Sequence, residues 1–218
     1  MRDSDIRAVF RALKRFSKTR DLPVVERIER ENSDPFLVLI SCLLSLRTKD
    51  EVTEAASRRL FEIARTPQQM LSIPLAKIRR LIYPVGFYRT KSLRIHRICH
   101  HLLGRFRGRV PEALEELLTL PGVGRKTANL VMTLGHKKLG ICVDVHVHRI
   151  SNRLGYVRTR TPFDTEMALR EKLPRPYWME YNALLVRFGQ ELCRPLSPWC
   201  SRCPVRAYCR RVGVTRSR

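Results

Sequence analysis

Residues 112 to 135 read EALEELLTLPGVGRKTANLVMTLG and form the central motif of the sequence. Apolar side chains recur at three- and four-residue spacing on both sides of the turn LPGVG, residues 120 to 124. The pattern predicts a helix, a tight turn and a second helix that begins just after Gly124. Glycines permit backbone angles that side chains forbid, and the unpaired N–H groups at a helix start favour a phosphate. The hairpin is a candidate nucleic-acid contact, although an ordinary Gly-rich αα-hairpin has the same pattern.

The composition favours a nucleic-acid partner. The chain has 218 residues, with 43 Lys and Arg against 20 Asp and Glu, and a formal net charge of +23 at pH 7. An excess of this size indicates a polyanion, because basic side chains bind phosphates and release condensed counterions. Charge alone also fits a ribosome-associated protein or one that coats nucleic acid without specificity.

The sequence has no pattern that indicates a membrane protein. No run reaches the length of apolar residues that a spanning helix needs, and the N-terminus lacks the features of a signal peptide. We expect no membrane partner and a cytoplasmic protein, associated with the nucleoid if the host is a prokaryote. The seven cysteines are then not expected to form disulfides. The first residues instead predict a helix with one apolar face, formed by Ile6, Val9, Phe10, Leu13 and Phe16.

Helix signals dominate the rest of the chain. Asp34 and Thr66 each precede a proline, a combination of N-cap and first-turn proline that begins helices. Gly104 and Gly108 are expected where helices end. Residues 141 to 148 alternate apolar and polar side chains, which by periodicity alone indicates a strand. We find no partner strand, so the predicted fold class remains all-α.

Two residues near the hairpin are candidates for chemistry. Lys126 lies in the first turn of the second helix, where the helix dipole and partial burial would favour the neutral, nucleophilic amine that forms Schiff bases. A lysine that only contacts a phosphate is the alternative. Asp144 follows 18 residues later and precedes an apolar helix, as an N-cap does. A carboxylate held by N–H groups can also steady a positive charge that develops on a sugar.

Four cysteines crowd into one C-terminal segment with the spacing C-x6-C-x2-C-x5-C. Four thiolates this close fit a structural zinc ion or a 4Fe–4S cluster, but zinc sites usually have two separated pairs. The surrounding arginines indicate a structural loop that presents positive charge rather than a redox site. The segment contains Cys193, Cys200, Cys203 and Cys209, whereas Cys42, Cys99 and Cys142 are interpreted as core thiols. The tail over residues 210 to 218 is expected to fray.

Three motifs, LPGVGRKTANLV, VDVHVHRISNRLG and the cysteine spacing, occur in the order and spacing of a known family. They resemble endonuclease III of the helix-hairpin-helix DNA glycosylase superfamily, and the resemblance covers roughly residues 5 to 212. It implies two helical lobes with DNA bound across the cleft. One lobe, residues 25 to 135, contains about six helices and the hairpin. The other combines residues 1 to 24 with residues 136 to 218 and carries a 4Fe–4S cluster.

The resemblance also implies a function and a set of site residues. The protein is expected to be a monomeric, bifunctional DNA glycosylase and abasic-site lyase of base-excision repair, acting on duplex DNA with oxidised pyrimidines or abasic sites. Lys126 matches the family's nucleophilic lysine and Asp144 its essential aspartate. The four clustered cysteines match the cluster ligands. The residues expected to contact DNA are Arg47, Phe87, Gly122, Val123, Gly124, Arg125, Thr127, His146 and Arg194.

Three positions depart from the better-known bacterial members. Arg47 replaces the glutamine that fills the gap opposite the flipped nucleotide, which leads to the hypothesis that guanine is preferred there. Phe87 replaces a leucine in the wedge loop, and a core phenylalanine is the alternative interpretation. Val145 replaces a threonine and is expected to loosen hydrogen bonding next to Asp144.

Other functions share parts of this pattern. Adenine and mismatch-thymine glycosylases of the superfamily carry the cluster but typically lack a lysine at the position of Lys126. A non-catalytic DNA-binding protein would use the hairpin and the charge without chemistry. A redox-sensing regulator would use the cluster, but the sequence has no separate effector segment. The combination of Lys126 with four clustered cysteines favours the endonuclease III type.

Overall fold

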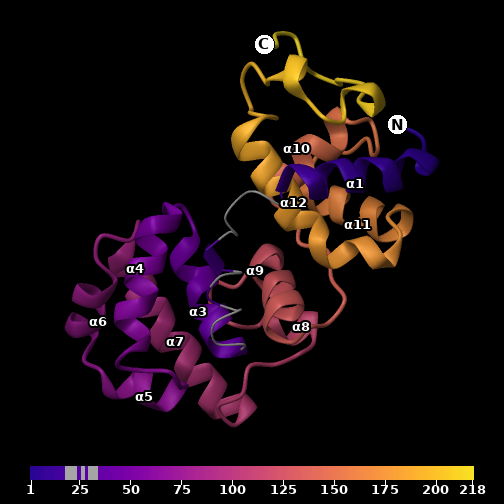
Figure 1. Cartoon of the computed structure of the whole chain (residues 1–218). Coiled ribbons are helices and arrows are strands. Elements are labelled where there is room, and N and C mark those ends of the chain that lie inside the picture. Colours follow the sequence, from indigo (N-terminus) through magenta and orange to yellow (C-terminus); the bar gives the residue numbers. More distant parts are fainter. Residues whose placement is uncertain (18–23, 26–27, 29–33) are drawn as a thin grey trace. The chain divides into compact units, whose positions relative to one another are not determined.

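The structure is a computed structural model that describes residues 1–17, 24–25, 28 and 34–218. Every regular element in these residues is helical, so the all-α prediction is confirmed and residues 141 to 148 form no strand. The chain divides into two compact units, which we describe separately (Figure 1). The first unit is Met1–Asp21 with Leu139–Arg218, and the second is Leu22–Lys138. The lobe expected over residues 25 to 135 falls within the second unit.

A buried central helix organises the second unit. Helix α3, Pro35–Ser45, is apolar on all sides, and every residue from Phe36 to Leu44 is buried. A helix of this kind requires neighbours on every face, and α3 is packed by α4, α7, α9 and the π-helical turn η2. The predicted N-cap is confirmed, because the Asp34 carboxylate accepts a hydrogen bond of 2.7 Å from Phe36 N.

The helices around α3 begin and end mostly at the predicted signals. The Thr66 hydroxyl accepts from Gln69 N and begins α5, as predicted. Gly108 follows the end of α7 in a left-handed conformation. The prediction for Gly104 is wrong: it lies inside α7, on an open face where no Cβ would be obstructed. The bounds are α4 Asp50–Phe61, α5 Pro67–Ser72, α6 Leu75–Ile82, α7 Tyr88–Phe106, α8 Leu114–Leu117, α9 Arg125–Leu130 and η2 Val131–Gly135.

The first unit packs two helices on a long C-terminal helix, α12. The predicted apolar face of the N-terminal helix is confirmed, and the Phe10 ring stacks on Tyr181 of α12 at 5.6 Å between centroids. Both chain ends belong to this unit (Figure 1). Its elements are α1 Ile6–Ser17, α10 Val145–Arg153, α11 Pro162–Lys172 and α12 Trp178–Glu191, with short 3-10 turns η1 Asp3–Asp5, η3 Arg175–Tyr177, η4 Cys200–Arg202 and η5 Arg206–Tyr208.

The C-terminal tail is held by the rest of the first unit. Val212 N donates to Arg153 O at 3.1 Å, and Arg218 N donates to Pro198 O at 2.9 Å. The expected fraying of residues 210 to 218 is therefore wrong, because main-chain hydrogen bonds at both ends of the tail fix it. In the described part of the chain, no helix is both long and apolar enough to cross a membrane.

Candidate functional site

The predicted hairpin lies in the second unit between α8 and α9. Val123 N donates to Leu120 O at 3.0 Å and closes the turn. Gly122 has φ +79°, a conformation that favours glycine, and a Cβ there would lie 3.0 Å from the side chain of Arg94. Gly124 is the N-cap of α9 and faces open space. The turn therefore leaves the N-terminal end of α9 accessible to a large ligand.

The hairpin residues that are expected to contact DNA differ in how far they are exposed to solvent. Gly122 and Gly124 are exposed and Arg125 is half-buried. Val123 and Thr127, in contrast, are only 6% and 3% exposed. Their side chains are buried in the second unit, and the expectation that these two residues contact DNA stays a prediction.

Lys126 lies in the first turn of α9, as predicted, and its side chain is exposed. The prediction of partial burial is wrong. The position at the start of a helix, where a positive charge is unfavourable, is the feature that sets Lys126 apart from other exposed lysines. Its charge lies near the buried thiol of Cys42 in α3. Burial raises the pKa of Cys42 to about 12, and the positive charge of Lys126 acts in the opposite direction.

Asp144 belongs to the first unit and caps α10, as predicted. One carboxylate oxygen accepts hydrogen bonds from His146 N and Val147 N, both at 2.9 Å. The side chain is 7% exposed, so these N–H groups hold the carboxylate where water has little access. Val145 is 66% exposed, and both hydrogen bonds form beside it, so the expected loosening by this valine is not seen.

His146 is less available than expected. The residue is half-buried, and its Nδ1 lies 3.1 Å from the guanidinium of Arg149. The ring also packs against Gly189 of α12, where any Cβ would collide with it. The ring therefore takes part in the packing of α10 on α12.

The structure brings Arg47 and Phe87 together in the second unit. The guanidinium of Arg47 lies 5.7 Å from the centre of the Phe87 ring. Both residues have left-handed backbones, with φ of 53° and 58°. Phe87 is 62% exposed, so the alternative of a core phenylalanine is wrong. An exposed aromatic ring on a constrained turn is suited to insertion between stacked bases.

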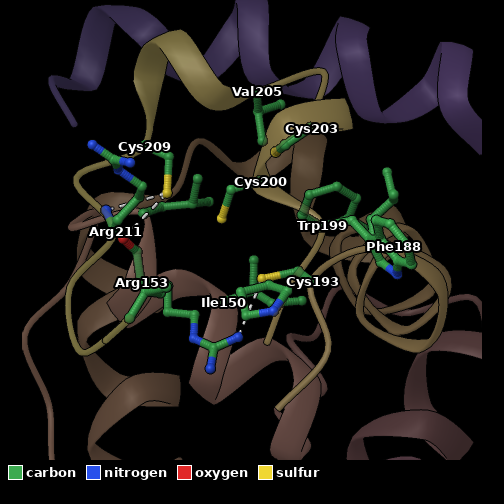
Figure 2. Close-up of a pocket in the computed structure, with 14 residues that line it drawn as sticks. Ile150, Arg153, Phe188, Cys193, Trp199, Cys200, Cys203, Val205, Cys209 and Arg211 are labelled. Carbon is green, nitrogen blue, oxygen red and sulfur yellow. Dashed lines mark hydrogen bonds between the residues drawn. The ribbon is translucent and has the colours of Figure 1, made fainter. Parts of the chain in front are cut away.

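The four clustered cysteines line one cavity in the first unit, and Figure 2 shows their sulfur atoms facing a common space. The cavity has about 380 Å³ that is free of protein atoms, including its mouth, and apolar side chains such as Ile150 and Val205 complete its wall. The other three cysteines are buried, as predicted for core thiols.

Two arginines of α10 hold the segment that carries the first cysteine. Arg149 donates to Cys193 O at 2.9 Å, and Arg153 donates to Arg194 O at 2.6 Å. Arg153 also lies 3.6 Å from the Cys193 sulfur, and Arg211 N donates to the Cys209 sulfur at 3.4 Å. N–H donors and positive charge stabilise thiolates. Arg194 itself is exposed.

Four cysteine thiols around one cavity can hold a metal group. In the described residues, no three His, Cys, Asp or Glu side chains are close enough to share one metal ion. A structural zinc needs four ligands at about 2.3 Å from one centre. A four-iron cluster takes one thiolate per iron and separates the four sulfurs more widely. The apolar wall and the N–H donors to sulfur also fit an iron–sulfur group.

Comparison with known proteins identifies the family. Residues 40–175 match the family model of the HhH-GPD superfamily of base excision DNA repair proteins. Over 188 residues the chain is 50% identical to endonuclease III of Thermotoga maritima, covering 85% of this chain and 88% of that protein. The chain belongs to the endonuclease III family.

Two further similarities extend this result. The chain is 44% identical over 183 residues to the chloroplastic endonuclease III homolog 2 of Arabidopsis thaliana, covering 80% of this chain and 47% of that longer protein. It also matches the solved structure of a trapped endonuclease III–DNA covalent intermediate, with a TM-score of 0.84 and 33% identity over 97% of each chain. The resemblance drawn from the three sequence motifs is therefore confirmed.

Sequence reasoning missed residues that support this endonuclease III site. Arg149 and Arg153 are four residues apart on α10, so their shared helix face is a signal that the sequence contains. Lys91 was not singled out, although it is the one lysine among the described residues that is buried. It occupies an apolar-face position of α7, in register with Ile95 and Ile98. A lysine in such a position indicates an ammonium group with internal partners.

Proposed function

We propose that this protein is a bifunctional DNA glycosylase and abasic-site lyase, and that it removes oxidised pyrimidines from duplex DNA. The observation that carries the proposal is the exposed Lys126 in the first turn after the hairpin, in a chain that belongs to the endonuclease III family. A monofunctional glycosylase needs no nucleophilic lysine at this place. The net charge of +23 supports duplex DNA as the partner.

The reaction begins with a nucleotide that leaves the base stack, because its sugar carbon is inaccessible inside the duplex. Phe87 fills the space left in the stack, and Arg47 faces the unpaired base. The N–H groups at the start of α9, next to Gly122 and Gly124, hold a phosphate of the damaged strand. Each of these contacts is part of the proposal.

Lys126 then attacks C1′ with its neutral amine, and the C1′–N bond to the damaged base breaks. The carboxylate of Asp144 stabilises the positive charge that develops on the sugar. The adduct opens to a Schiff base, which acidifies the C2′ proton. Loss of this proton expels the 3′ phosphate and breaks the strand, and hydrolysis of the Schiff base restores Lys126.

We further propose that Cys193, Cys200, Cys203 and Cys209 bind a 4Fe–4S cluster. When bound, the cluster cross-links the C-terminal segment and so has a structural role. Arg194, which is exposed beside the first ligand, then contacts a DNA phosphate. We also propose that the protein acts as a monomer in the cytoplasm, associated with the nucleoid if the host is a prokaryote.

A duplex with a single thymine glycol tests the function. The wild-type protein should break the damaged strand without added alkali, while Asp144→Asn should reduce base release by at least about a hundredfold. The same duplex with intact thymine is the control and should stay whole. Strand breaks that appear only after alkali would show a monofunctional glycosylase, and no base release on any damaged duplex would contradict the proposal.

A further inference from the structure

Lys91 of α7 is a buried lysine whose ammonium group is fully hydrogen-bonded. Its side chain is 3% exposed. Nζ donates to Leu44 O at 2.8 Å, to Leu46 O at 2.6 Å and to the Thr48 hydroxyl at 3.1 Å. An ammonium has three protons and no lone pair, so these three acceptors use all of its hydrogen-bonding capacity. The burial of this amine keeps it away from a substrate, which excludes Lys91 as a nucleophile.

The two carbonyl groups that Lys91 binds lie at the end of α3. Carbonyls in the last turn of a helix lack partners within the helix and attract positive charge. Lys91 satisfies them from a different helix and so fixes the point where the chain leaves α3. Arg47 follows directly, with φ 53°. A left-handed backbone is unfavourable for a residue with a side chain, so this turn needs support from its surroundings.

The third acceptor, the Thr48 hydroxyl, links this turn to the loop that carries Gly86 and Phe87. The Thr48 hydroxyl, which accepts from Lys91, also accepts from Gly86 N at 3.1 Å. The two loops are in close contact there, since a Cβ on Gly86 would lie 2.6 Å from Arg47 O. Phe87 comes next in the chain. Lys91 and Thr48 therefore connect the loop that carries Arg47 with the loop that carries Phe87.

We propose that Lys91 is a positioning residue that fixes the Arg47–Phe87 pair for insertion into duplex DNA. The proposal rests on the proposed function, in which this pair enters the base stack. Two loops that are fixed before binding lose little conformational freedom when they insert. Without the ammonium, Leu44 O and Leu46 O lose their bonds to Nζ, and Leu46 O retains the Thr48 hydroxyl donor at 3.3 Å. The two left-handed turns then lose their common support.

The test compares insertion with lyase chemistry in one variant, Lys91→Met. Insertion is measured by the fluorescence of 2-aminopurine placed next to a non-cleavable tetrahydrofuran site in a duplex. Lyase chemistry is measured as cleavage of an abasic site in a single-stranded oligonucleotide, which has no stack to enter. Cys99→Ala, a buried change eight residues further along the same helix, is the matched control for lost stability.

Wild-type protein should increase the 2-aminopurine fluorescence when it binds, and Lys91→Met should lose most of this increase. The variant should also cleave a duplex abasic site at least tenfold more slowly, while its single-strand cleavage stays within twofold of wild type. Cys99→Ala should keep both activities. If Lys91→Met folds poorly, Thr48→Val removes the hydroxyl that joins Lys91 to Gly86 but keeps the Lys91 bonds to Leu44 O and Leu46 O. It should show the same selective loss to a smaller degree. Normal fluorescence and duplex cleavage in these variants would overturn the positioning role, whereas a wild-type protein that cleaves neither substrate would overturn the proposed function itself.

Discussion

The guanidinium of Arg47 lies 5.7 Å from the centre of the exposed Phe87 ring, although 40 positions separate the two residues in the sequence. Each side chain extends from a left-handed turn, and Gly86 allows the turns to approach closely. A planar cation held beside an aromatic wedge can hydrogen-bond a base while the ring fills the stack.

The position of Arg47 leads to a prediction about the base opposite the lesion. A guanidinium can donate two parallel hydrogen bonds to guanine O6 and N7, which adenine cannot accept in the same way, and such a pair is worth about 1–3 kcal/mol. Wild-type protein should therefore release thymine glycol at least about fivefold faster opposite guanine than opposite adenine. Arg47→Gln should remove this ratio, and Arg89→Gln should keep it. Equal wild-type rates opposite the two purines would refute the hypothesis.

Lys91 leads to a prediction about stability and pH. Burial, with a smaller effect of the Arg94 charge, lowers the pKa of Lys91 from 10.5 to about 8. Between these values the unfolded chain binds more protons at this site than the folded chain, so the free energy of unfolding gains a contribution that rises with pH. The free energy of unfolding of wild type, relative to that of Lys91→Met, should rise by up to about 3 kcal/mol from pH 8 to pH 10.5. Urea unfolding at both pH values measures it, and a difference independent of pH would be inconsistent with the lowered pKa.

The cysteine cavity leads to a prediction about metal content. Protein purified without oxygen should contain about four iron atoms per chain and no stoichiometric zinc. Cys203→Ser should lose the iron and unfold at least about 5 °C lower, since about 2 kcal/mol corresponds to 4–8 °C at this chain length. Cys142→Ala, which changes a buried thiol outside the cavity, should keep its iron. One zinc per chain would show that the site is a closed single-ion centre.

Arg194 provides a prediction about affinity for DNA. A single phosphate contact contributes about 0.9 to the slope of log K against log salt concentration. Arg194→Ala should reduce the slope by about this amount on damaged and undamaged duplexes alike. Arg216→Ala, an exposed change in the tail, is the control. An unchanged slope in Arg194→Ala would show that this arginine does not bind a phosphate.

Features that depend on a few neighbouring residues were predicted correctly from the sequence. The helix starts at Asp34 and Thr66, the turn before α9 and the cap at Asp144 each follow from a local pattern of hydrogen-bond donors and acceptors. The four cysteines could be grouped because their spacing alone keeps them close.

Features that depend on distant residues could not be predicted in this way. A glycine such as Gly104 is typical of a helix end, but α7 continues through it to Phe106. The tail is fixed by Arg153 and Pro198, which no local pattern indicates. Lys91 finds its acceptors more than 40 residues earlier in the chain. The only local indication that Lys91 is buried is its position on the apolar face of α7.

Borohydride trapping on a duplex that contains one thymine glycol tests directly whether Lys126 forms a Schiff base with the substrate. Reduction of a Schiff base would leave a covalent protein–DNA adduct with the wild-type protein. The adduct should disappear in Lys126→Ala and persist in Lys137→Ala, a nearby exposed lysine of the same unit. An adduct that persists in Lys126→Ala would assign the nucleophile elsewhere, and base release without any adduct in wild type would contradict the lyase mechanism.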